Sequence, residues 1–239
     1  MTSGPPESLA PDERIGVLFD IDGTLLDMRG AGRRSFARAL ETVFGWQDDI
    51  EYVNFAGNTD LNVLQQVMTA HGHPLTQAEQ RAFFARLPEE LEQAAAGSAL
   101  ILFPGVRELL EALSGDSRVL LGLVTGNIES CAHIKLRQFN LHGHFVLGAF
   151  GDEHADRVEI ARLALGRLRE ALDPGAGLRA CYLVGDTPFD IAAASNIGAV
   201  SVAVATGTFD RDALRQAGAD HVLTDLSDTA AVLRLLGLR

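Results

Sequence analysis

Cysteine is scarce in this 239-residue chain, and long apolar runs are missing. The two cysteines, Cys131 and Cys181, stand in apolar or helical stretches, and neither has the spacing of a metal site or a redox motif. We therefore predict two reduced core residues and no disulfide framework. No stretch reaches the length of a membrane span, and the polar, Pro-rich N-terminal residues lack the apolar core of a signal peptide. A cytoplasmic location is the resulting expectation.

Positive charge is also in short supply, with 20 Lys and Arg against 32 Asp and Glu and a formal net charge of -12. Nucleic acids and anionic membranes are bound through clustered basic side chains, so the balance argues against both as partners. A small-molecule partner fits better, and both a monomer and a homodimer remain open. Lysine occurs once, as Lys135.

Short apolar runs alternate with helical patterns over most of the chain. Residues 15–20 (IGVLFD) form an apolar run that ends in an acid, and similar runs recur after Pro104. Between Arg33 and Gly97 the apolar spacing is helical throughout. Strands that are apolar on both faces are typical of a parallel sheet covered by helices. The predicted fold class is α/β, a Rossmann-like doubly wound parallel sheet with a helical cap inserted after the first strand.

Three parts of the chain follow from this pattern. We expect a loose tail at 1–13, an α/β core formed by 14–26 together with 99–239, and a helical cap at 27–98. Ligands of open α/β sheets bind at the carboxyl ends of the strands, so the residues that follow the predicted strands are the candidates for a site.

Four acids follow two of these strands. Asp20 and Asp22 are two residues apart, so in extended backbone their side chains lean to the same side. One is suited to be a nucleophile and the other a general acid and base, provided that a cation limits their repulsion. Asp186 and Asp190 follow a later strand, and such carboxylates are the hard oxygen ligands that Mg²⁺ prefers. The sequence predicts Mg²⁺ as the cofactor.

A third strand ends in Thr125, Gly126 and Asn127, which offer a hydroxyl and backbone N–H groups at a helix start. Phosphoryl oxygens commonly bind in such a place. Taken singly, an acid after a strand is more often a helix cap, and the Thr-Gly-Asn sequence is more often an ordinary turn. Their joint occurrence at strand ends, in this order, favours a phosphate-handling site.

At these residues the chain resembles the haloacid dehalogenase-like hydrolase superfamily, and in particular its helical-capped, phosphoglycolate phosphatase-like branch. The D-x-D-G-T hallmark of that superfamily corresponds to residues 20–24. Its second motif, a strand ending in Ser or Thr, corresponds to 124–127, and its fourth, G-D-x-x-x-D, to 185–190. The resemblance covers the whole predicted core, and it places a cap between the first two motifs.

The resemblance implies a role for each matching residue. Asp20 would be the nucleophile, Asp22 the acid and then the base, and Thr125 a phosphate ligand. Mg²⁺ would be held by Asp20, the main-chain carbonyl of Asp22 and Asp186, with Asp190 in support. An acid at position 22 is typical of the phosphatases of this superfamily, because their alkoxide leaving group needs a proton, and dehalogenases lack it.

The third motif departs from the pattern, because the usual Lys-Pro is missing. Asp156-Arg157 stands at the matching place, so Arg157 is the first candidate for the cation that steadies the charge on Asp20 and the phosphate. Lys135 is the rival, eight residues past Asn127 and about 12 Å along a helix at about 1.5 Å per residue. A plain surface lysine is an equally good interpretation of that position.

The predicted cap contains one segment, residues 55–60, that resembles the cap loop of phosphoglycolate phosphatase and β-phosphoglucomutase relatives. Gly57, Asn58 and Thr59 are therefore candidate substrate-binding residues. The Arg that often follows the Gly in relatives is Asn58 here, which weakens the case for a carboxylate on the substrate. Three further arginines could compensate but are better explained as solvated helix charges: Arg29, Arg33 and Arg34.

These observations predict a magnesium-dependent phosphohydrolase that cleaves a small-molecule phosphomonoester through an aspartyl-phosphate. A phosphomutase of the β-phosphoglucomutase type is one alternative, although the predicted cap has no lysine and offers only His71 and His73 as acid and base. Their position beside Gly72 and Pro74 favours loop histidines instead. A non-catalytic binding module on the same fold is the other alternative, and the intact motif acids argue against it.

Overall fold

A six-stranded parallel sheet forms the centre of the computed structural model, which describes residues 12–238. Its strand order is β5-β4-β1-β6-β7-β8, so β1 lies in the middle of the sheet. The strands are β1 (Glu13–Phe19), β4 (Val119–Val124), β5 (Leu147–Ala149), β6 (Gly177–Gly185), β7 (Val200–Val204) and β8 (His221–Leu223).

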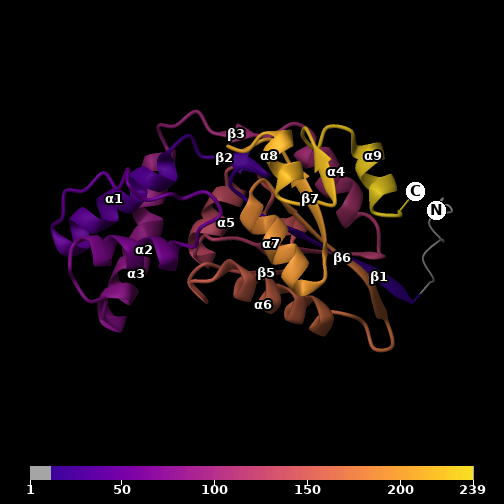
Figure 1. The fold of residues 1–239 in the computed structure, drawn as a ribbon, viewed down its shortest axis with the longest axis horizontal. Coiled ribbons are helices and arrows are strands. Elements are labelled where there is room, and N and C mark those ends of the chain that lie inside the picture. Colours follow the sequence, from indigo (N-terminus) through magenta and orange to yellow (C-terminus); the bar gives the residue numbers. More distant parts are fainter. Residues whose placement is uncertain (1–11, 239) are drawn as a thin grey trace.

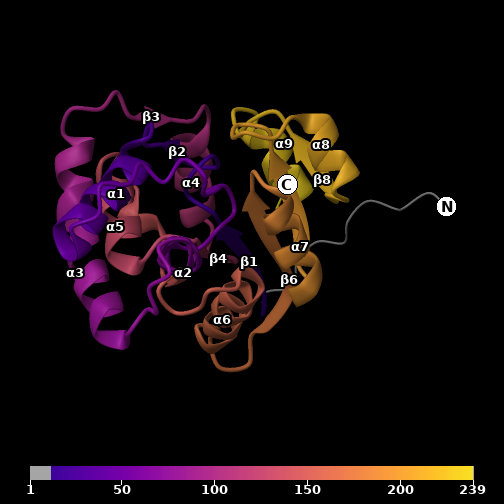
Figure 2. The ribbon, with the colours of Figure 1, turned by 60° about the vertical axis from the view of Figure 1, so that its left-hand side comes forward.

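Helices cover both faces of this sheet (Figures 1 and 2). One face is covered by α6 (Arg157–Glu170) and α7 (Pro188–Ile197), and their side chains share a buried cluster with Leu18 of β1. The other face is covered by α4 (Val106–Ser114), α5 (Glu129–Arg137) and α9 (Thr229–Leu235), with α8 (Arg211–Gln216) beside β8. Because β1 is buried on both faces, its run from residue 15 to 19 is continuously apolar.

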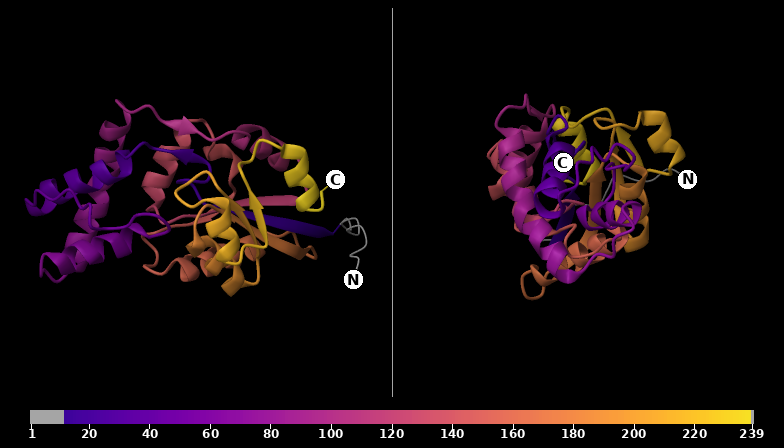
Figure 3. Two further views of the ribbon diagram at one scale, coloured as in Figure 1. Left: turned by 45° about the horizontal axis from the view of Figure 1, so that its top comes forward. Right: turned by 90° about the vertical axis from the view of Figure 1, so that its left-hand side faces the viewer.

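Three helices lie apart from the sheet, at the end of the molecule opposite to α9 (Figures 1 and 3). They are α1 (Ala31–Phe44), α2 (Asp60–Ala70) and α3 (Gln77–Ala95). The helix α1 packs against α3, and the rings of Phe36 and Phe83 lie 4.7 Å apart between them. The capping box formed by Thr76 and Glu79 begins α3. This helical group has its own apolar interior, which is continuous with the core under α4 and α5.

A short antiparallel pair links the helical group to the sheet. It is formed by β2 (Leu26–Asp27) and β3 (Ile101–Leu102), which stand directly before α1 and after α3. Sequence patterning did not predict this pair, because two residues are too few to show an alternation.

The predicted α/β fold class is confirmed by the parallel sheet and its two helical layers. The division of the chain at residues 27 and 98 stays a prediction. Most of the predicted tail lies outside the described residues, and β1 begins at Glu13. Cys131 and Cys181 are free and buried, as expected. Between residues 12 and 238, no helix is long and apolar enough to cross a membrane.

Candidate active site

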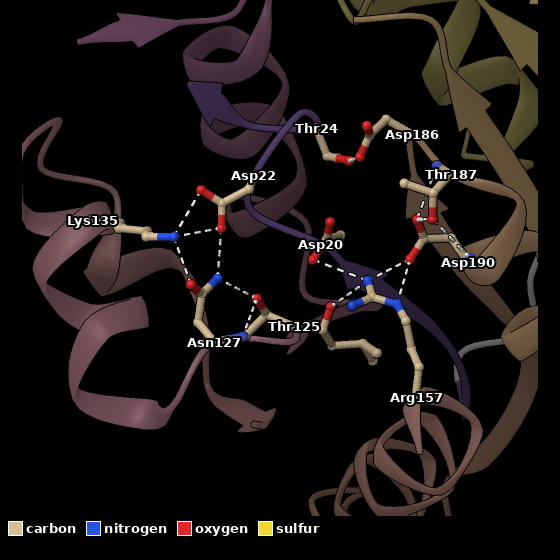
Figure 4. A network of polar contacts seen from close by, with 11 residues as sticks. Asp20, Asp22, Thr24, Thr125, Asn127, Lys135, Arg157, Asp186, Thr187 and Asp190 are labelled. Carbon is tan, nitrogen blue, oxygen red and sulfur yellow. Dashed lines mark hydrogen bonds and ion pairs between the residues drawn. The ribbon is translucent and has the colours of Figure 1, made fainter. Parts of the chain in front are cut away.

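Three neighbouring strands bring acids and a threonine of the candidate site to one edge of the sheet, and two helices add its basic side chains (Figure 4). Asp20 follows β1, Thr125 follows β4 and Asp186 follows β6. Since β4, β1 and β6 are adjacent and parallel, residues more than 100 positions apart in the chain become neighbours. The hydrogen bonding between β1 and β6 continues past the end of β1, where the Asp20 N–H donates to the Val184 carbonyl at 2.9 Å.

Three of the predicted acids form a buried cluster. Oxygens of Asp20, Asp186 and Asp190 lie within 4.8 Å of one another, and each side chain is buried. Burial, with the neighbouring carboxylates, raises the pKa of Asp20 to about 6 and the pKa of Asp186 to about 8. The Thr24 hydroxyl donates to Asp186 at 3.1 Å. Such crowding disfavours three charged carboxylates unless a cation joins them, and the all-oxygen donor set suits Mg²⁺.

Arg157 is the cation beside this cluster. Its Nη2 lies 3.0 Å from Asp20 Oδ1, and its Nε donates to Asp190 Oδ1 at 2.9 Å. The guanidinium is buried, because Arg157 is the first residue of α6 and points beneath the strand ends (Figure 4). The other oxygen of Asp190 accepts the hydroxyl and N–H of Thr187. Of the two candidates for the third-motif cation, Arg157 is therefore the one that contacts Asp20.

The Asp22 side chain belongs to a second network and points away from the acid cluster (Figure 4). Lys135 Nζ donates to its two oxygens at 2.8 and 2.6 Å. Asn127 Nδ2 donates to Asp22 Oδ2 and to Thr125 Oγ1, both at 2.7 Å, and its Oδ1 accepts from Lys135. Lys135 is only 5% exposed, so it is not a surface lysine. The two basic side chains thus serve different carboxylates.

The loop before α2 is fastened to the strand-end loops. Gly57 and Asn58 line the cavity above the carboxylates, together with Gly126. A Cβ atom on Gly126 would lie 1.8 Å from the Asn58 carbonyl oxygen, so only glycine permits this approach. Thr59 does not line the cavity. It caps α2 by accepting the Asn62 N–H, and its hydroxyl donates to the Ala155 carbonyl at 2.9 Å.

Asp60 is a cavity residue that sequence reasoning missed. Its N–H donates to the Gly126 carbonyl at 2.7 Å, and its carboxylate accepts the Ile128 N–H at 2.9 Å. Burial raises the pKa of Asp60 to about 6, although the positive charge of Lys135 acts against this shift. Asp60 ends the segment 55–60 that resembles a cap loop, but an acid in the first turn after a Thr cap is ordinary in any helix, so it was not chosen as a candidate.

The cavity has a volume of 490 Å³ and lies between the strand ends and the three separate helices. Its floor includes the predicted residues Asp20, Asp22, Thr125, Lys135 and Arg157. The loop histidines stay outside it: His71 stacks on Trp46 at 4.1 Å and bonds Asp48, and His73 bonds Glu79.

Comparison with known proteins agrees with this geometry. A phosphoglycolate phosphatase of Synechococcus elongatus is 31% identical over 214 residues, which are 89% of this chain and 93% of that protein. A 5'-nucleotidase of Pseudomonas aeruginosa is 29% identical over 219 residues, 91% of this chain and 94% of the relative. Among solved structures, a candidate β-phosphoglucomutase from Thermotoga maritima matches with a TM-score of 0.60 and 26% identity, over 92% of this chain and 98% of the other.

One family spans nearly the whole of the site. Residues 17–204 match the haloacid dehalogenase-like hydrolases, a stretch that runs from within β1 to the end of β7. It contains the acid cluster, Arg157, Lys135 and all three separate helices. The resemblance predicted from the sequence motifs is thereby confirmed, and the chain belongs to the haloacid dehalogenase-like hydrolase family.

Proposed function

We propose that this hydrolase cleaves a small-molecule phosphomonoester through a phosphoryl intermediate on Asp20. The observation that carries the proposal is the position of Asp20, buried at the end of the central strand with the Arg157 guanidinium 3.0 Å from one carboxylate oxygen. The relatives named as a phosphoglycolate phosphatase and a 5'-nucleotidase support a phosphate ester as substrate.

The first half-reaction is nucleophilic. A carboxylate oxygen of Asp20 attacks phosphorus, and the bond to the leaving oxygen breaks as Asp22 gives that oxygen a proton. The Thr125 hydroxyl and the Gly126 N–H donate to phosphoryl oxygens, and Asn127 orients the Thr125 hydroxyl, to which its backbone N–H and Nδ2 both donate. Arg157 stabilises the negative charge shared with Asp20. In the second half-reaction, Asp22 takes a proton from water, which attacks phosphorus and releases phosphate from Asp20.

The acid cluster fits Mg²⁺. The hydrogen bonds that its residues already make indicate which of them would hold the ion and which would support it. Asp20, Asp186 and the main-chain carbonyl of Asp22 would hold the ion. Asp190 would support them, since its two oxygens already accept from Arg157 and Thr187. Bound there, Mg²⁺ supplies positive charge against the crowded carboxylates and the phosphate. We propose in addition that the helices within 27–98 act as a cap, and a cytoplasmic location stays a prediction.

Phosphate release from a panel of phosphomonoesters, with Mg²⁺ and with EDTA, tests the proposal. Release that requires the metal supports a phosphohydrolase. Turnover only with a bisphosphate activator, returning phosphate to substrate, identifies a mutase instead. A protein that binds esters without turning any over is the non-catalytic module. His71 and His73 do not line the cavity, which disfavours the mutase, because its acid and base would have to contact the bound sugar.

The affinity for Mg²⁺ is expected to rise with pH. Burial raises the pKa of Asp20 to about 6 and of Asp186 to about 8, so near neutral pH the metal displaces protons. Without metal these raised pKa values stabilise the fold at low pH, and that stability is lost as the pH rises through about 6 and then 8. Calorimetry should show a dissociation constant at least about tenfold lower at pH 8.5 than at pH 6.5, with proton release. An affinity independent of pH would contradict the assignment.

Lys135→Met is expected to lower kcat about 10- to 100-fold, because Asp22 loses the ammonium that orients both of its oxygens. Steady-state phosphate release measures the effect. Arg137→Met is the matched control, since it removes a cation from the exposed side of the same helix. Equal rates in the two variants would show that the Lys135 contact with Asp22 has no part in the reaction.

A further inference from the structure

Much of the cavity wall that faces the carboxylates is apolar, although Ser35, Asn58 and Asp60 also line it. Its apolar part is built by helices α1, α2 and α3 and the segments that flank α1, through the side chains of Met28, Phe36, Phe55, Val63, Leu87 and Leu91. Apart from Phe55, each of these side chains is at most 3% exposed. A leaving group that projects from the phosphate therefore contacts hydrocarbon side chains. Such contacts favour binding only when the leaving group is itself apolar.

Among the described residues, three basic side chains line the cavity, and each is already engaged. Lys135 is held by Asp22 and Asn127, and Arg157 by Asp20 and Asp190. These four contacts belong to the catalytic floor. A second anionic group on the substrate finds no spare cation there.

The third basic side chain, Arg33, has a structural task. Its guanidinium donates to the Ile50 carbonyl and, at 2.9 Å, to the Val53 carbonyl. It also lies 4.6 Å from the centre of the Phe55 ring. The sequence favoured a solvated charge at Arg33, and the structure instead shows it half-buried and fastening the loop before α2. Two of its five N–H groups are thereby used on that loop, and the loop and the Phe55 ring fix the position of the guanidinium.

The charge around the cavity also disfavours a second anion. Acidic side chains exceed basic ones by two among the lining residues, with Asp27 and Asp60 added to the catalytic acids. A divalent cation at the acid cluster brings the charge of the lining residues to zero, so no net positive charge is left for a second anionic group. A carboxylate on the leaving group would be repelled rather than drawn in.

The size of the cavity also favours a bulky leaving group. At 490 Å³ it falls within the range of roughly 300 to 1,000 Å³ that is typical of pockets for drug-sized ligands. A phosphate with a two-carbon leaving group would leave most of the apolar wall uncovered. Resting on the proposed function, we infer that the substrate is a phosphomonoester whose leaving group is uncharged and apolar and large enough to contact α1, α2 and α3.

Three phosphate esters of primary alcohols test this inference. They have the form phosphate–O–CH₂–X, where X is methyl in ethyl phosphate, carboxylate in phosphoglycolate and cyclohexyl in cyclohexylmethyl phosphate. We expect kcat/KM for the cyclohexyl ester to exceed that for ethyl phosphate by at least about tenfold. In an apolar pocket, even one additional methylene can raise kcat/KM by about tenfold or more. Phosphoglycolate is expected to fall below ethyl phosphate.

A pair of variants on one helix identifies the wall that is responsible. Val63 lines the cavity, whereas Val67, one turn later on α2, is equally buried but does not. Val63→Thr should lower kcat/KM for the cyclohexyl ester about threefold to tenfold and leave ethyl phosphate within about twofold. Val67→Thr should change both esters by the same factor, and thermal melts of both variants check that the fold is kept.

The outcomes separate this inference from the proposed function. If phosphoglycolate is the best of the three, or if all three react equally, the apolar leaving group is wrong and the phosphohydrolase stands. If Val63→Thr affects all esters alike, the wall does not select the substrate. If none of the three releases phosphate while another ester of the panel does, the apolar leaving group is again wrong and the phosphohydrolase stands. If no ester of the panel releases phosphate, the phosphohydrolase itself is refuted, and the inference falls with it.

Discussion

Asp20→Asn is expected to lower kcat by at least about 10⁴-fold, the scale of loss when a covalent nucleophile is removed. An amide cannot form the phosphoryl intermediate, whereas every other contact of the site remains. The measurement is phosphate release with saturating Mg²⁺, together with mass spectrometry of acid-quenched enzyme for a phosphorylated chain. Asp212→Asn, on the exposed helix α8, is the matched control and should react at the wild-type rate.

The loss in Asp20→Asn should not come from unfolding. Burial raises the pKa of Asp20 to about 6, so above that pH the folded protein holds a charge that its surroundings resist. At pH 8 without metal, a neutral amide at this position should therefore leave the urea midpoint unchanged or higher. Near-wild-type turnover in Asp20→Asn would remove the nucleophile assignment and with it the aspartyl-phosphate.

Arg157→Met is expected to lower the free energy of unfolding by about 3–5 kcal/mol at pH 8 without metal, as when one partner of a buried ion pair is lost. The guanidinium is the only basic group bonded to Asp20 and Asp190 among the described residues, and both carboxylates are buried. Removing it leaves their charges uncompensated. Urea unfolding, followed by far-UV circular dichroism, gives the value.

Two further variants define the effect at Arg157. Arg162→Met, on the same helix, removes a half-exposed pair with Glu159 and should change the stability by less than about 1 kcal/mol. Arg157→Lys keeps the charge but lacks the planar guanidinium that places Nε on Asp190 and Nη2 on Asp20, so an intermediate stability is expected. A stable Arg157→Met protein with normal Mg²⁺ binding would show that the metal site needs no guanidinium.

The grouping of the candidate catalytic residues at one edge of the sheet was largely predictable, because these residues belong to short motifs at strand ends. Asp20, Thr125 and Asp186 each follow an apolar run, and in a parallel sheet such positions share one edge. The apolar runs themselves predicted the strands, since a strand buried on both faces has no room for polar side chains. The pair formed by β2 and β3 was not predicted, because strands of two residues are too short to show an alternating pattern.

Residues outside the motifs could not be assigned in this way. Asp60 looks like an ordinary helix-start acid, and only the approach of the loop to Gly126 brings it into the cavity. Thr59 was a candidate for substrate binding and is used to cap α2. Phe36 and Leu91 fall within the stretch of helical apolar spacing, which predicted no contact with a ligand, and the structure places both in the core and in the cavity wall.

The sequence by itself determined the α/β class, the strand-end acids and the family, because these depend on local patterns and motif spacing. Only the tertiary structure decided which cation serves which carboxylate. Arg157 and Lys135 lie 32 and 10 residues beyond Thr125, and their partners depend on how α6 and α5 are oriented over the sheet. The apolar cavity wall was decided in the same way, since it is enclosed only when three separate helices close over the strand ends.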